Sequence, residues 1–240
     1  MKRLSLLTLV FAIFFAFFFL LLIFFRIPFP LYPLMSYQDI LDLLTPLVLI
    51  PLYWLLFKSS TRGESPGAEE VAFMVLAALW VLGQGMHLSV NSVNNLIESL
   101  AKKQVIDITE TDIYRLAYFL DEHLSHYAWH SGIMGLAALL IYREWQRPAG
   151  IRPLWWATAL GGLIYGFTFF CLVLEGQTVP LGLPFATIIT LLTLIWGRQR
   201  LGRQPLLAFF FMAFLVATLL FTGWGLYWRG FPQFTDVGLI

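Results

Sequence analysis

Charged residues are scarce in this chain. They make up 12% of its 240 residues, whereas hydrophobic residues make up 59%. A water-soluble domain carries about 25% charged residues, because its surface must be hydrated. So few charges exclude a water-soluble globule of this size. The net charge of +1 gives no basic surface, so no nucleic-acid partner is expected.

Cysteine and long polar links are also nearly missing. The one cysteine, Cys171, excludes an intramolecular disulfide and a metal site made of several cysteines. The links between apolar segments reach only about a dozen residues, which is too short for a separate soluble domain. We therefore expect one integral membrane domain over 1–240, with the lipid bilayer as its main partner.

Long apolar runs dominate what is present. A helix needs about 20 apolar residues to cross the hydrocarbon of a bilayer. The first run, Leu4 to Phe25, is longer than a signal-peptide core and no small-x-small cleavage site follows it, so we expect a retained helix. The sequence predicts an all-α polytopic bundle of about seven transmembrane helices, at 4–25, 40–57, 70–100, 113–142, 154–174, 183–197 and 205–228.

The basic residues predict the orientation. With seven spans, ten of the fifteen Lys and Arg residues fall on one side of the membrane: Lys2, Arg3, Lys58, Arg62, Arg143, Arg147, Arg152, Arg198, Arg200 and Arg203. Cytoplasmic loops carry this excess. The N-terminus is therefore predicted to be cytoplasmic and the C-terminus outside, in a multi-pass protein of the cell membrane.

Polar residues in the third span repeat at helical spacing. Steps of three or four residues place Gln84, His87, Asn91, Asn94 or Asn95, and Glu98 on one helix face. Gly83 and Gly85 beside them permit the close approach of another helix. Ionisable residues inside a span are costly, so they indicate a functional site by default.

The fourth span carries a second polar stripe. Glu122, His126 and His130 follow each other at i, i+4, with His123 close to the stripe. In a regular helix Asp121 is turned about 100° away, beside Ser125. The short link between the third and fourth spans predicts antiparallel neighbours. The two stripes then face one polar cavity, which opens outward.

This set of side chains predicts a metal-dependent membrane enzyme. Imidazole and carboxylate groups bind divalent transition metals, zinc above all, and the candidate ligands are His87, Glu122, His126 and His130. Asp121 or Glu122 is the candidate general base of a hydrolase-like reaction on a lipid-type substrate. Supporting or substrate-binding roles are expected for Gln84, Asn91, Asn94, Asn95, His123 and Ser125.

Three alternatives remain open from the sequence. Chains of Asp, Glu and His inside a membrane also serve transporters of metal ions or protons. His87 and His130, at similar depth on adjacent helices, are spaced as two axial ligands of a haem in an electron-transfer protein. The polar residues could also form a hydrogen-bond network without a ligand, which fastens the two helices.

Overall fold

The computed structural model describes residues 3–60, 67–102, 110–148 and 150–239, and nearly all of them lie in helices. The α-helices are α1 (Arg3–Ala16), α2 (Tyr37–Ser59), α3 (Gly67–Lys102), α4 (Asp112–Tyr118), α5 (His126–Gln146), α6 (Trp155–Glu175), α7 (Val179–Leu192) and α8 (Pro205–Trp228). Between them lie the π-helical turns η1 (Phe17–Leu21), η3 (Phe119–Ser125) and η4 (Thr193–Gly197), and the 3₁₀ turns η2 (Leu22–Phe25) and η5 (Arg198–Arg200).

Helices lie at all seven predicted spans. Within the described residues, six helical segments are long and apolar enough to cross a membrane, which is consistent with a helical membrane bundle. The fourth predicted span, formed by α4, η3 and α5, is not one of these six. It carries Asp121 and Glu122 in its middle and Arg143 and Glu144 near its end.

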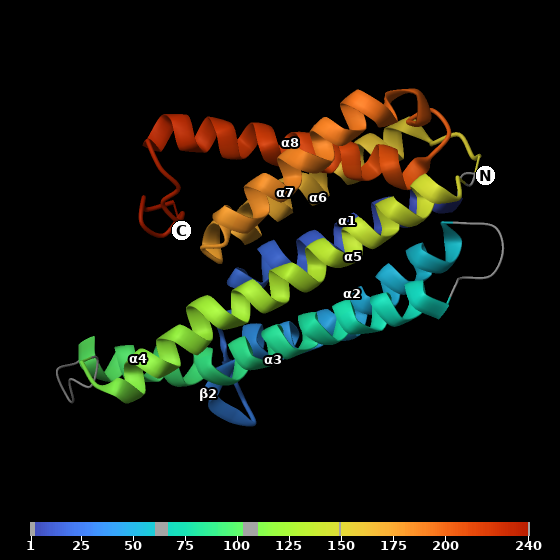
Figure 1. Cartoon of the computed structure of the whole chain (residues 1–240). Helices are drawn as coiled ribbons and strands as arrows, with labels where there is room; N and C mark the ends of the chain where they lie inside the picture. The colour runs from blue at the N-terminus through green and yellow to red at the C-terminus, as the bar shows by residue number, and fades with distance from the viewer. Residues whose placement is uncertain (1–2, 61–66, 103–109, 149, 240) are drawn as a thin grey trace.

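Two groups of helices face each other across α1 and α5. Figure 1 shows α6, α7 and α8 on one side and α2 and α3 on the other, with α1 and α5 between them. The core where the groups meet is aromatic, because Phe11 and Phe15 of α1 pack on Tyr165 of α6. The Tyr165 hydroxyl bonds to the Tyr53 hydroxyl of α2 at 2.9 Å, so the buried polar ends satisfy each other.

Helix α3 packs closely against η3 and α5, in agreement with the expectation from the short link. Glycine makes this approach possible. A Cβ atom added at Gly83 would lie 2.6 Å from the Ser125 carbonyl oxygen, and one added at Gly132 would lie 2.7 Å from the Trp80 backbone nitrogen. Gly85 has nothing within 4 Å of such an atom, so of the two glycines singled out in the sequence only Gly83 lies at the contact.

A short hairpin between α1 and α2 was not predicted. Strand β1 (Pro28–Phe29) pairs antiparallel with β2 (Tyr32–Ser36) after the first helix ends. The hairpin leads into a capping box, in which Ser36 Oγ accepts from the Asp39 backbone nitrogen at 3.2 Å and the Asp39 carboxylate accepts from the Ser36 backbone nitrogen at 2.7 Å. These two bonds between Ser36 and Asp39 cap the N-terminus of α2.

Candidate active site

A π-helical turn carries the acidic residues of the fourth span. Residues Phe119–Ser125 form η3, in which the backbone bonds run from i to i+5. The Ser125 hydroxyl bonds to the Asp121 carbonyl, so the two residues are neighbours, as regular helical spacing predicts. Asp121 is fully buried and contacts α3. π turns are frequent at functional sites.

Asp121 joins the two polar stripes. Its Oδ1 lies 2.8 Å from Nδ1 of His87, in a close contact that is not aligned as a hydrogen bond. Its Oδ2 accepts a hydrogen bond from the Asn94 side-chain nitrogen at 3.3 Å. One carboxylate of the fourth span therefore holds two side chains of the third, and the orientation of His87 depends on it.

Three imidazoles lie in a row beside this contact. The ring centres of His87 and His126 are 4.8 Å apart, and those of His126 and His130 are 5.7 Å apart. Trp129 touches all three, with ring-centre distances of 5.8, 5.7 and 4.9 Å. The structure thus brings together the three histidines that the two stripes predicted to be near each other.

Hydrogen bonds indicate which nitrogen of each ring carries the proton. His126 Nδ1 lies 2.9 Å from the Glu122 carbonyl oxygen, which can only accept, so this Nδ1 is the donor. His130 Nδ1 lies 2.5 Å from Thr178 Oγ1, and the Thr178 hydroxyl points to the Val173 carbonyl at 3.4 Å. When that hydroxyl donates to the Val173 carbonyl, Thr178 Oγ1 accepts from His130, and Nδ1 is again the donor.

The same tautomer follows for His87. A carboxylate oxygen at 2.8 Å from Nδ1 is favourable only if that nitrogen carries a proton. In its neutral form, each of the three rings then keeps a lone pair on Nε2. The Nε2 atom of His130 is buried and has no partner among the described residues.

The positions do not form a ready metal site. Within the described residues, no three His, Cys, Asp or Glu side chains are arranged to hold a metal ion. The His126 and His130 rings are stacked at 17°, with their centres 5.7 Å apart. The zinc and haem expectations both stay predictions.

A large cavity lies beside the histidine row. Its volume is about 1230 Å³, and its wall comes from η1 and η2, the hairpin, the start of α2, α3, η3, α5, the second half of α6 and the C-terminal tail. The polar part of the wall includes Asp39, Asp42, His87, Asn91, Asn94, Glu122, His126, His130 and Glu175. The apolar part includes Phe18, Leu21, Phe24, Leu96, Phe167 and Leu172. The cavity is therefore amphipathic.

The other predicted site residues lie elsewhere. Gln84 accepts from the Trp80 indole and donates to Asp42, so it fastens α2 to α3. The Ser125 hydroxyl bonds to the Asp121 carbonyl, and His123 packs between Tyr118 and Phe119. Neither Ser125 nor His123 lines the cavity. The Asn95 side chain lies outside the described part of the structure.

Several contributors to the site were not identified from the sequence. Thr178 fixes the His130 tautomer from the turn before α7, and no local pattern marks it. Position 176 needs a glycine, because a Cβ atom there would lie 2.5 Å from His130 Cε1. Trp129 lies between two histidines in sequence, three residues after His126 and one before His130, and this position was a usable signal.

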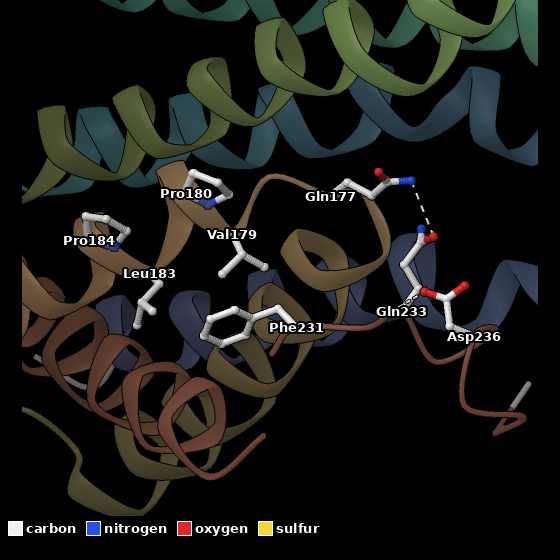
Figure 2. Close-up of a pocket in the computed structure, with 8 residues that line it drawn as sticks. All are labelled: Gln177, Val179, Pro180, Leu183, Pro184, Phe231, Gln233 and Asp236. Atoms are coloured by element: carbon white, nitrogen blue, oxygen red, sulfur yellow. Dashed lines mark hydrogen bonds between the residues drawn. The ribbon is translucent and has the colours of Figure 1, made fainter. Parts of the chain in front are cut away.

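The C-terminal tail forms part of the cavity wall. The Phe234 backbone nitrogen donates to Glu175 Oε1 at 2.5 Å, and the Phe234 ring packs on Trp224 at 4.9 Å. A smaller pocket of about 420 Å³ lies on the α7 side, between Pro180 and Pro184 and the tail residue Phe231 (Figure 2). Gln177 and Gln233, bonded at 3.3 Å, line both spaces and so separate them.

Removing the tail anchor is expected to expose the cavity. Cys171, the one cysteine of the chain, lines the cavity and is 8% exposed. Replacing Phe234 with alanine removes the ring that packs on Trp224 and Phe170, so we expect Cys171 to react several-fold faster with N-ethylmaleimide. Phe231→Ala is the matched control, because Phe231 lines only the smaller pocket. Equal rates in both variants would show that the tail does not control access.

The chain matches no family model, and no curated protein or solved structure is significantly similar to it.

Proposed function

We propose that this protein is a membrane enzyme that hydrolyses an amphipathic, lipid-like substrate with His87 as the general base. One observation carries the proposal. His87 is held by the Asp121 carboxylate through Nδ1, at the wall of a large amphipathic cavity, so its Nε2 lone pair is left for the reaction. A histidine held by a buried carboxylate is a recurrent arrangement for general bases.

The reaction needs only groups that the chain supplies, together with water. Nε2 of His87 takes a proton from a water molecule, and the oxygen of that water attacks the carbonyl carbon of an ester or amide. The bond from that carbon to the leaving oxygen or nitrogen breaks, and the leaving group receives the proton from His87. Asp121 stabilises the imidazolium that exists between the two transfers.

The volume and the lining of the cavity suit a lipid-like substrate. Its volume of about 1230 Å³ exceeds the usual range for small-molecule sites, about 300–1,000 Å³. Aromatic and aliphatic side chains such as Phe18, Leu21 and Phe167 suit a hydrocarbon chain, while the histidine side suits a polar group. We propose that the substrate enters from the bilayer.

The proposed topology places this cavity at the outer side of the cell membrane. In this proposal the segment from α4 to α5 also crosses, as the fourth of seven spans, since it packs along α3 and carries the site. The N-terminus is then cytoplasmic and the C-terminal tail lies outside, as the excess of Lys and Arg predicts.

A zinc-dependent version of the same reaction is the second candidate. A metal-binding histidine usually donates its other ring nitrogen to a carboxylate, a carbonyl or another acceptor. His87, His126 and His130 each have such an acceptor at Nδ1. In this version Glu122 completes the ligand set, and a metal supplies Lewis-acid activation of water. Transport of a metal ion or a proton, and haem binding, remain further alternatives.

A lipid-cleavage screen tests the proposal. Detergent-purified full-length protein is incubated with a panel of lipid esters and amides, and the released fatty acid is measured. We expect cleavage of at least one class, and a loss of about 10²- to 10⁴-fold for His87→Gln. His123→Gln is the matched control, because His123 does not line the cavity. No cleavage, or equal cleavage by both variants, would overturn the proposal.

The same preparation distinguishes the candidates. The metal-dependent version is favoured if the wild-type protein contains stoichiometric zinc, His126→Ala does not, and a chelator inhibits lipid cleavage. Activity that persists in the chelator would favour His87 acting alone. Metal uptake into proteoliposomes without cleavage would favour a transporter, and a Soret absorption band would favour haem.

A further inference from the structure

Basic residues gather at one end of the helix bundle. The starts of α1, α3, α6 and α8 and the ends of α2, α5 and α7 lie there, on the right in Figure 1. Hydrogen bonds join them, from the Leu154 backbone nitrogen to Ser5 Oγ at 3.0 Å and from Gln204 Nε2 to the Glu144 carbonyl at 3.1 Å. The basic residues described at this end, called the basic end below, are Arg3, Lys58, Arg143, Arg147, Arg152, Arg198, Arg200 and Arg203.

The acidic residues described at the basic end do not balance this charge. Each is bonded within the protein: Glu70 to Lys58, Glu69 to Arg143 and Arg147, and Glu144 to the Leu207 backbone nitrogen. Arg152, Arg198 and Arg203 are exposed, and none of them has a hydrogen-bond or ion-pair partner among the described residues. Their charges are therefore left for a partner outside the chain.

Two of these arginines lie on the short link between α7 and α8. Arg198 begins the 3₁₀ turn η5, and the Arg203 backbone nitrogen donates to the Arg200 carbonyl at 2.8 Å, which closes the next turn. The Arg200 guanidinium stacks on the Trp145 ring at 4.4 Å and donates to the Trp145 carbonyl at 2.9 Å. The link is therefore held on the end of α5, with Arg198 and Arg203 exposed on it.

Exposed aromatic rings mark the depth of the link in the membrane. Trp196 lies two residues before Arg198, and Trp155 and Trp156 follow Arg152 at the start of α6, all three with exposed rings. Tryptophan rings settle where the hydrocarbon of a bilayer meets the headgroups. The exposed arginines beside them therefore lie at the level of the lipid phosphates.

We propose that the 198–203 link binds the phosphate of an anionic phospholipid, in the leaflet that surrounds the basic end. The guanidinium groups of Arg198 and Arg203 donate to the phosphate oxygens, and Arg152 adds to the positive potential of this end. The exposed side chains of Ile195 and Trp196 contact the acyl chains, which a free phosphate ion lacks. The inference does not depend on the proposed hydrolysis, because the cavity lies at the opposite end of the bundle.

Lipid titration of the purified protein tests this inference. Full-length protein in nonionic detergent is mixed with dioleoylphosphatidylglycerol, which is anionic, or with dioleoylphosphatidylcholine, which has no net charge. Native mass spectrometry measures the bound lipid. We expect the anionic lipid to bind at least about fivefold more tightly, since each basic residue near a membrane surface contributes about that factor. Raising the concentration of ammonium acetate should reduce the preference. Free glycerol phosphate should not displace the lipid.

Variants show whether the link causes the preference. Arg198→Gln and Arg203→Gln together should weaken binding of the anionic lipid by about 25-fold, the product of two such factors, and leave the neutral lipid unaffected. Lysine at both positions should keep the preference, because the charge is kept. Arg229→Gln is the control, since Arg229 is exposed at the other end of α8. Equal binding of the two lipids, displacement by glycerol phosphate, an unchanged preference in the glutamine variant or an equal loss in Arg229→Gln would each overturn the inference.

Discussion

Replacing Asp121 with asparagine is expected to lower turnover by about 10²- to 10⁴-fold while leaving substrate binding nearly unchanged. Asparagine has the same shape, so the packing of η3 on α3 should persist. The carboxylate is lost, however, and with it the group that keeps the proton on His87 Nδ1. An amide at this position can also donate to Nδ1, which would move the proton to Nε2 and remove the base.

The measurement is kcat with the lipid identified by the cleavage screen, together with the dissociation constant of a non-cleaved analogue. Gln84→Leu is a useful comparison, because it removes a buried polar contact between α2 and α3 without touching His87. It should lower thermal stability more than turnover. A fall in binding equal to the fall in kcat for Asp121→Asn would instead indicate that Asp121 only supports the fold.

The helices could be predicted from the sequence because hydropathy over about 20 residues is a strong signal. Helix α6 is predicted at 154–174 and found at Trp155–Glu175, and α8 is predicted at 205–228 and found at Pro205–Trp228. The hairpin at Pro28–Ser36 was not predicted, since its five-residue strand carries no alternation of polar and apolar residues.

The approach of His87 to the histidines of the fourth span could be predicted from spacing, but its partner could not. Depth along the two helices pairs His87 with His130, whereas the structure packs the His87 ring on His126 at 4.8 Å. The contact of Asp121 with His87 was also not predicted, because spacing within one helix does not show which side chains of two packed helices touch. The role of Thr178 could not be predicted either, because it bonds to His130 from 48 positions away in the sequence.

The tail shows a similar limit. Glu175 is the last residue of α6. Its hydrogen bond to the Phe234 backbone joins residues 59 positions apart, through a segment without regular structure. Hydropathy gives the ends of helices, but the docking of an irregular segment depends on side-chain contacts that only the fold creates.

Gly83→Val is expected to separate α3 from the fourth span and to abolish activity. Even a single added carbon at Gly83 would overlap the Trp129 backbone nitrogen and lie 2.6 Å from the Ser125 carbonyl oxygen. Backbone atoms cannot move aside as a side-chain tip does, so the helices must shift apart. The His87–Asp121 contact lies across this same packing surface and would open with it.

Gly85→Val supplies a closely matched control. It makes the same change in the same helix two residues away, where an added Cβ meets nothing within 4 Å. Both variants carry the same helix-propensity effect, so the difference between them isolates the contact with η3 and α5. We expect Gly83→Val to unfold at a lower temperature, because overpacking costs about 1–3 kcal/mol or more, and to lose activity in the lipid-cleavage screen. Gly85→Val should resemble the wild type in both measurements. If the two variants behave alike, the close approach of α3 to the fourth span does not hold the site together, and the His87–Asp121 contact must be maintained by other elements.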